Sequence, residues 1–127
     1  MQVIADTSFL MIPGMFGVDI IGELDRVLGC SCELLIPSPV ISELKRISKQ
    51  GKPRERTAAR LGLILAKRGS VVSILGEADE SILKLAVEKK CLVGTSDLVL
   101  RKKLRACGIN VIYLSGKSHL ALSGQLR

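Results

Sequence analysis

The sequence is poor in aromatic side chains: its 127 residues include two Phe, one Tyr and no Trp. Because 47% of the residues are nevertheless hydrophobic, the core must be filled by aliphatic side chains, and the composition excludes a disordered chain. A length of 127 residues suits one domain, so we expect a single unit over residues 1–127 with its core in 2–114. The tail at 115–127 is too short and too mixed to predict.

Long apolar runs are absent too, since none approaches the ~20 residues that span a bilayer. No basic residue precedes Asp6, unlike in a signal peptide, so we expect a cytoplasmic protein without a membrane partner. In that compartment the four cysteines should be reduced rather than paired. Cys30 and Cys32 lack a second pair or a nearby His that would complete a zinc site, and His119, the sole histidine, lies in the tail.

Acidic residues are in the minority. Twelve Asp and Glu against nineteen Lys and Arg give a net charge of +7. This balance favours a polyanionic partner, with nucleic acid the leading candidate. The alternative is that the charge serves solubility alone.

Short β-branched runs alternate with helical patterns along the chain. Strands are predicted at residues 2–5, 33–36, 71–75, 91–94 and 110–114. Helices are predicted at residues 18–28, 39–47, 54–67, 77–90 and 98–107. Continuous hydrophobicity in the strands is typical of strands covered on both faces, and the alternation predicts βαβ units. The fold class is therefore an α/β sandwich around a parallel sheet.

One helix start and one helix face are specific enough to test. Ser38 followed by Pro39 predicts the N-cap and the first position of the second helix. In the third helix, Leu61, Ile64 and Leu65 are expected to face the core.

Four acidic residues fall where strands end or where the next helix begins. Asp6 directly follows the first strand, and Asp97 comes shortly after the fourth. Asp79 lies in the opening turn of the helix after the third strand, and Glu43 lies about one turn into the helix after the second. Because the carboxyl ends of parallel strands share one edge of a sheet, we expect these four side chains at the same rim.

Crowded carboxylates repel one another, which raises their pKa values unless a cation is present. Their hard oxygen atoms suit Mg²⁺ or Mn²⁺, which bind substrate phosphates and activate water for phosphodiester hydrolysis. Other interpretations exist for single residues: Asp79 and Asp97 could cap helices, and Glu43 could pair with a basic neighbour. Asp6 is harder to explain in this way, because a charge at the end of an interior strand needs a partner.

The segments around these acids resemble the motifs of the PIN-domain nuclease family. Its first motif is similar to residues 3–10, Val-Ile-Ala-Asp-Thr-Ser-Phe-Leu, and its second to residues 38–44, Ser-Pro-Val-Ile-Ser-Glu-Leu. Its third resembles residues 78–82, Ala-Asp-Glu-Ser-Ile, and its fourth residues 94–100, Gly-Thr-Ser-Asp-Leu-Val-Leu. The likeness runs in order from residue 2 to about residue 114.

The resemblance implies a three-layer sandwich with a central parallel sheet ordered 3-2-1-4-5, and Mg²⁺- or Mn²⁺-dependent endoribonuclease activity in rRNA processing. The implied catalytic metal ligands are Asp6, Glu43, Asp79 and Asp97. Ser8 and Thr95 would orient ligands or waters, and Glu80 matches an extra acid found in some relatives. A toxin-type PIN ribonuclease is the competing role. A homodimer is favoured, and no antitoxin or ribosome-assembly partner can be named.

Two basic stretches emerge beside the expected site. The candidate RNA-binding residues are Lys45, Arg46, Lys49 and Arg54 in the first stretch and Arg101, Lys102 and Lys103 in the second. A solvated helix face is the ordinary interpretation of such a stretch, and a track for RNA phosphates is the sharper one. The scarcity of aromatics argues against platforms on which unpaired bases stack, so we expect selectivity to come from RNA shape or from a partner.

Other acidic α/β classes fit less well. A response-regulator receiver needs an Asp at the end of the third strand, where residues 73–76 read Ser-Ile-Leu-Gly. A haloacid-dehalogenase-type phosphatase needs a second Asp where Ser8 stands. The alternative from another functional class is a non-catalytic RNA-binding or assembly module of the same fold.

Overall fold

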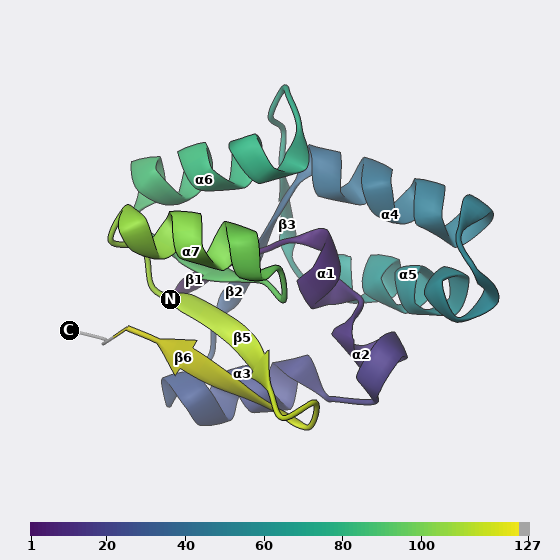
Figure 1. Ribbon diagram of the computed structural model, residues 1–127, viewed down its shortest axis with the longest axis horizontal. Coiled ribbons are helices and arrows are strands. Elements are labelled where there is room, and N and C mark those ends of the chain that lie inside the picture. Colours follow the sequence, from purple (N-terminus) through teal and green to yellow (C-terminus); the bar gives the residue numbers. More distant parts are fainter. Residues whose placement is uncertain (125–127) are drawn as a thin grey trace.

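The computed structural model describes residues 1–124, and this part of the chain folds around one sheet (Figure 1). Its strands are β1 (Gln2–Ala5), β2 (Glu33–Pro37), β3 (Ser70–Val72), β4 (Leu92–Gly94), β5 (Val111–Ser115) and β6 (His119–Ser123). Its helices are α1 (Thr7–Leu10), α2 (Ile12–Phe16), α3 (Ile20–Leu28), α4 (Ser38–Gln50), α5 (Pro53–Ala66), α6 (Ala78–Lys89) and α7 (Leu98–Ala106). Within residues 1–124, no helix combines the length and the apolar character that crossing a membrane requires.

The strand order is β3-β2-β1-β4-β5-β6, and the first five strands run parallel, which confirms the predicted order 3-2-1-4-5. Strand β1 is central: its Ile4 pairs with Leu35 on one side and with Val93 on the other. Val3, Ile4 and Ala5 are fully buried. Burial on both faces explains why this strand is continuously hydrophobic.

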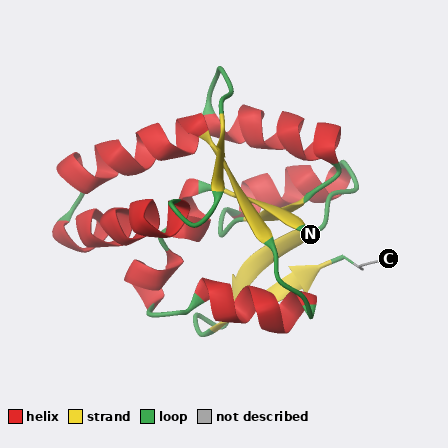
Figure 2. Cartoon of the chain, turned by 180° about the vertical axis from the view of Figure 1, so that it is seen from behind, coloured by secondary structure: helices red, strands yellow, loops and turns green. Residues whose placement is uncertain are grey.

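Helices cover both faces of the sheet, as a three-layer sandwich requires. Helices α6 and α7 lie on one face (Figure 1), and the reverse view shows α3 across the other (Figure 2). Helices α4 and α5 pack against each other, and α5 also packs against α1 and α2. The short helices α1 and α2 follow β1 directly, and the sequence patterns did not predict them.

The tail that the sequence left undecided contributes strand β6, which pairs antiparallel with β5. Leu120 in β6 is buried, and its backbone is held by α3. Its N–H donates to the Glu23 carboxylate at 2.8 Å, and Arg26 donates to its carbonyl oxygen at 2.8 Å. The end of the tail, residues 125–127, lies outside the described residues.

The predicted inward face of α5 is wrong for two residues, because Leu61 is 42% exposed and Ile64 is 61% exposed. The helix instead buries a stripe of small residues, Ala58, Ala59, Gly62 and Ala66. This stripe lets α5 approach the backbone of α1 and α2 closely: a Cβ on Gly62 would lie 3.0 Å from the Leu10 carbonyl oxygen. The small side chains allow close packing between the helices, and the larger side chains of Leu61 and Ile64 therefore lie on the outer face of α5.

The third strand is shorter than predicted, since β3 ends at Val72 and residues 73–77 form a loop that projects from the sheet in Figure 1. Leu75 in this loop is 97% exposed. The predicted cap at Ser38 is also wrong, because Pro37 holds the N-cap position of α4. The Ser38 hydroxyl instead fixes the loop, donating to the Ile74 carbonyl at 3.1 Å and accepting from the Ile74 N–H at 3.0 Å.

Candidate active site at the carboxyl edge of the sheet

Asp6 lies at the tip of the central strand and is only 5% exposed. Its Oδ1 accepts from the Ser8 hydroxyl and from the Phe9 N–H, both at 2.8 Å, and its Oδ2 accepts from the Thr95 hydroxyl. Burial raises the pKa of Asp6 to about 6, although these three donors lower it, and the nearby Asp79 raises it further. A carboxyl group this buried is costly to ionise unless a cation accompanies it.

Two hydroxyl groups connect Asp6 to the end of β4. The Ser8 hydroxyl accepts from the Ser96 N–H at 2.9 Å, and the fully buried Thr95 hydroxyl accepts from the Asp97 N–H at 3.0 Å. Ser8 and Thr95 therefore hold the tips of β1 and β4 in one arrangement. The role that the resemblance implied for them, orienting ligands or waters, stays a prediction.

Asp97 caps helix α7. Its Oδ1 accepts from the Val99 N–H at 2.8 Å and from the Leu100 N–H at 3.2 Å. Capping and ligation are therefore not alternatives for this side chain, because one oxygen atom serves the helix. Among the residues that the structure describes, Oδ2 of Asp97 has no hydrogen-bond donor, so it is available to another partner.

Asp79 lies in the first turn of α6, where Glu77 holds the N-cap position, so Asp79 is not a cap. Partial desolvation raises its pKa, and so do the charges of Asp97 and Glu43. Lys103 on α7 lowers the same pKa. Together with the effect of Asp79 on Asp6, these effects connect Asp79 electrostatically with the other three predicted acids and with one predicted RNA-binding lysine.

Glu43 and Asp79 line a common hollow of about 580 Å³ between α4 and the loop before α6. Glu77, to which the sequence patterns gave no role, lines this hollow too and raises the pKa of Asp79. The only sequence signal for it is its place two residues before Asp79. Glu80, the uncertain extra acid, is exposed on α6.

Asp6, Glu43, Asp79 and Asp97 share one edge of the sheet, which we call the acidic edge, but their side chains do not form a preorganised metal site. Within residues 1–124, no three Asp, Glu, His or Cys side chains converge closely enough to hold a metal ion. Of the four, Asp79 is exposed, Glu43 and Asp97 are half-buried, and Asp6 is buried. The metal-ligand set therefore stays a prediction.

The predicted RNA-binding residues have different surroundings. Lys45, Arg46 and Lys49 are exposed on α4, and Arg54 donates to the Met15 carbonyl oxygen at the end of α2. On α7, Lys102 and Lys103 are exposed, whereas the Arg101 guanidinium carbon lies 4.2 Å from the centre of the Tyr113 ring. Lys103 is thus the one that the electrostatics connect to the acidic edge.

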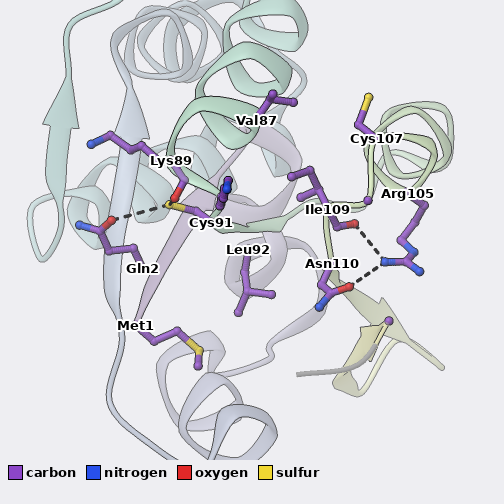
Figure 3. Close-up of a pocket in the computed structure, with 13 residues that line it drawn as sticks. Met1, Gln2, Val87, Lys89, Cys91, Leu92, Arg105, Cys107, Ile109 and Asn110 are labelled. Carbon is purple, nitrogen blue, oxygen red and sulfur yellow. Dashed lines mark hydrogen bonds between the residues drawn. The ribbon is translucent and has the colours of Figure 1, made fainter. Parts of the chain in front are cut away.

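A larger hollow, of about 1270 Å³, lies at the opposite, amino end of β1 and β4 (Figure 3). Its walls include Lys89 and Arg105, and the Cys91 thiol donates to the Gln2 side chain there. None of the four acids lines it. Size alone would therefore have pointed away from the acidic edge.

Comparison with known proteins identifies the family of this chain. Residues 3–117 match the model of the family described as "PIN like domain". Ribonuclease VapC9 of Archaeoglobus fulgidus is 33% identical over 111 residues, which cover 87% of this chain and 81% of that protein. Ribonuclease VapC4 of Methanocaldococcus jannaschii is 30% identical over 129 residues, 98% of each chain.

Among solved structures, the PIN domain endonuclease Utp24 matches with a TM-score of 0.79 and 24% identity, over 98% of this chain and 92% of that chain. A complex of VapBC2 from Rickettsia felis with a promoter DNA fragment contains a chain that matches with a TM-score of 0.60 and 17% identity, over 81% of this chain and 92% of that chain. These two likenesses concern the fold. Since the family model extends from β1 through β5, where all four acids lie, this chain belongs to the PIN-like domain family.

Proposed function

We propose that this chain is an endoribonuclease that hydrolyses RNA phosphodiester bonds with Mg²⁺ or Mn²⁺ held by Asp6, Glu43, Asp79 and Asp97. The observation that carries the proposal is the buried Asp6, with a pKa raised to about 6, at the shared edge of the sheet. Membership of a nuclease family supports hydrolysis, and two relatives at least 30% identical that are named ribonucleases support RNA as the substrate.

The side chains present fit a divalent cation. All four offer carboxylate oxygen atoms, the donors that Mg²⁺ and Mn²⁺ prefer. Burial raises the pKa of Asp6, and desolvation with neighbouring acids raises the pKa of Asp79. A bound cation would stabilise the ionised form of both groups and so offset the cost of their burial and repulsion.

When bound, such an ion polarises the phosphate and activates water at neutral pH. The chain's own residues provide orientation. Ser8 and Thr95 donate to opposite oxygen atoms of Asp6 and fix its carboxylate plane. The amides of α7 fix Asp97 through Oδ1, which leaves Oδ2 facing other partners. Lys103 adds positive charge near Asp79, where a substrate phosphate would approach.

The decisive experiment compares cleavage of RNA with Mn²⁺ by the wild type and by Asp6→Asn, with Asp25→Asn as an exposed acidic control on α3. We expect Asp6→Asn to lose about 100-fold or more in rate, since even residues that only orient metal ligands cost 10- to 100-fold. We expect Asp25→Asn to retain the wild-type rate. Equal cleavage by wild type and Asp6→Asn would refute the proposed site.

A second readout does not depend on activity. Mn²⁺ at about 100 times its dissociation constant should stabilise the wild type by about 2.7 kcal/mol, which is several degrees in melting temperature. The Asp6→Asn variant should show much less of this shift. If neither protein cleaves RNA or responds to Mn²⁺ but both still bind RNA, the non-catalytic binding module is favoured instead.

The cellular role is a finer proposal. The motif resemblance favours rRNA processing, and a toxin-type ribonuclease is the second candidate. Mapping of cleaved RNA ends in cells that express wild type or Asp6→Asn separates the two: cuts confined to rRNA precursors support the first role, and cuts in mature RNA that halt translation support the second.

A further inference from the structure

A second hollow, of about 250 Å³, adjoins the acidic edge at the tips of β4 and β5. Its walls include Thr95 and Asp97 from the candidate site, together with Phe16, Arg101 and Tyr113. The hollow with Glu43 and Asp79 lies toward the β3–β2 end of the same edge, and Asp6 on β1 lies between the two in the strand order. A strand of nucleic acid that crosses the edge would therefore meet both hollows.

Two of the three aromatic side chains of this chain line this hollow. Phe9 is fully buried in the core, against Gly94. The other two aromatic residues, Phe16 from the end of α2 and Tyr113 from β5, both line the hollow. Phe16 is 41% exposed, so filling the core does not explain its presence. A chain with three aromatic residues has placed two beside Asp97.

The hollow also contains a stacked cation. The Arg101 guanidinium carbon lies 4.2 Å from the centre of the Tyr113 ring, within the range of a cation–π contact. Bases of single-stranded RNA stack on aromatic rings and on arginine planes, and the positive charge of arginine also attracts the phosphate. Phe16, Tyr113 and Arg101 together form the kind of surface that binds a base by its face.

We propose that this hollow binds the unpaired base of the nucleotide next to the cleaved phosphodiester, so that it is a subsite for single-stranded RNA. The proposal rests on the ribonuclease function proposed above. Because Asp97 belongs to both the hollow and the acidic edge, a base seated between Phe16 and Tyr113 brings its own phosphate to that edge. A fully paired duplex keeps its bases stacked and presents none to the hollow.

The chain supplies its own probe for this contact. Tyr113 is its only tyrosine and it has no tryptophan, so tyrosine emission reports on the hollow alone. We expect a single-stranded oligoadenylate, added without divalent metal, to quench this emission, and the matching oligoadenylate–oligouridylate duplex to leave it nearly unchanged. Titration of N-acetyltyrosinamide with the same RNAs corrects for light absorbed by the RNA. Equal quenching by single strand and duplex would contradict the proposal.

A paired substitution tests the base itself. Phe16→Ala should weaken binding of single-stranded RNA roughly 5- to 100-fold, the usual effect of losing one stacking side chain. Leu61→Ala, which removes a similarly exposed hydrophobic side chain from α5, should leave binding unchanged. The second variable is an RNA that lacks one base, at a position beside the cut. The wild type should bind this RNA as weakly as Phe16→Ala binds the intact RNA. Removing that base should cost Phe16→Ala nothing further. The subsite would be overturned if the two losses of affinity, from the substitution and from the missing base, multiply. It would also be overturned if removal of a base weakens binding at no position.

The outcomes separate the subsite from the ribonuclease function. If Asp6→Asn abolishes cleavage but retains the quenching and the sensitive base position, both proposals stand. If RNA quenches the tyrosine emission and binding depends on the base, but the wild type does not cleave RNA, the subsite is supported and the ribonuclease function is refuted. Cleavage without quenching or base dependence would leave the ribonuclease and refute the subsite. Absence of RNA binding would refute both.

Discussion

The carboxyl group of Asp6 shows how opposing effects on one residue are resolved. Three hydrogen bonds from Ser8, Phe9 and Thr95 lower its pKa, yet burial is the largest effect and the pKa stays at about 6. The residue is thus held in position by donors without being fully compensated in charge. The proposed cation would supply the positive charge that this buried carboxylate lacks.

Thr95→Val removes the hydroxyl donor to Asp6 while keeping the shape of the side chain. Because a buried carboxylate oxygen then lacks its partner, we expect a loss of about 1–3 kcal/mol in the free energy of unfolding. Urea denaturation measures it. Thr57→Val is the control, since its hydroxyl donates to the Pro53 carbonyl on an exposed helix face. Equal stability of Thr95→Val and wild type would show that the Thr95–Asp6 contact contributes little.

At the scale of elements, the packing of α5 depends on small residues rather than large ones. Gly14 of α2 faces Ala58 so closely that a Cβ there would lie 2.3 Å from the Ala58 Cα. Such a clash involves backbone atoms, which cannot move away cheaply. The two helices must separate if either position grows.

Gly14→Ala should therefore destabilise the protein by about 1–3 kcal/mol through overpacking, although alanine is the better helix former. Leu61→Ala, on the exposed side of α5, should change stability by no more than about 0.5 kcal/mol. Thermal denaturation compares the two. The opposite ranking would mean that Leu61 faces the core, as the sequence pattern predicted.

Helix α3 and strand β6 are connected through one carboxylate. Glu23 accepts from Arg26 at 2.9 Å and from the Leu120 N–H at 2.8 Å, and these bonds lower its pKa from 4.5 to about 2. A group with a lowered pKa in the folded state stabilises the protein above its unfolded pKa. That contribution is lost as the pH falls from 4.5 toward 2.

Glu23→Gln should therefore lower the melting temperature at pH 7, and the difference from wild type should shrink between pH 4.5 and pH 2. Glu88→Gln, on the exposed side of α6, is the matched control. Melting curves across this pH range test the prediction. A difference that is the same at every pH would mean that ionisation of Glu23 does not hold β6.

For the whole molecule, the charge of +7 predicts binding to RNA that weakens with salt. Each phosphate neutralised on a single strand contributes about 0.7 to the slope of log affinity against log salt concentration. Lys103→Ala should reduce that slope by about 0.7, because Lys103 is near the acidic edge, whereas Lys67→Ala beyond the end of α5 should not. Fluorescence anisotropy with labelled RNA measures both. A slope near zero for the wild type would contradict the hypothesis that these basic residues bind RNA phosphates.

Much of this architecture could be predicted from local patterns. Strands covered on both faces read as continuous hydrophobic runs, so β1, β2, β4 and β5 were found within about a residue of their ends. Strand β3 was overextended, because hydrophobic residues such as Leu75 continue into an exposed loop. The four candidate acids were selected because each lies at the end of a strand or early in the helix that follows it. Glu77 was missed because its contribution depends on a hollow that α4 completes.

Local sequence patterns were enough to predict the α/β class, the five parallel strands, the five longer helices and the places of Asp6, Glu43, Asp79 and Asp97 after successive strands, but not α1, α2 or β6. The predicted features follow from short-range hydrophobic periods. Contacts between residues far apart in the sequence could not be predicted in this way, because they depend on how the elements pack. The Thr95 hydroxyl donates to Asp6 across 89 positions of the chain, and Phe16 and Tyr113, which lie outside the four motifs, line one hollow. The small number of aromatic residues argued against base stacking, but that number does not say where these residues lie in the fold. In the folded chain, α2 and β5 place two of the three aromatic residues at one hollow beside Asp97.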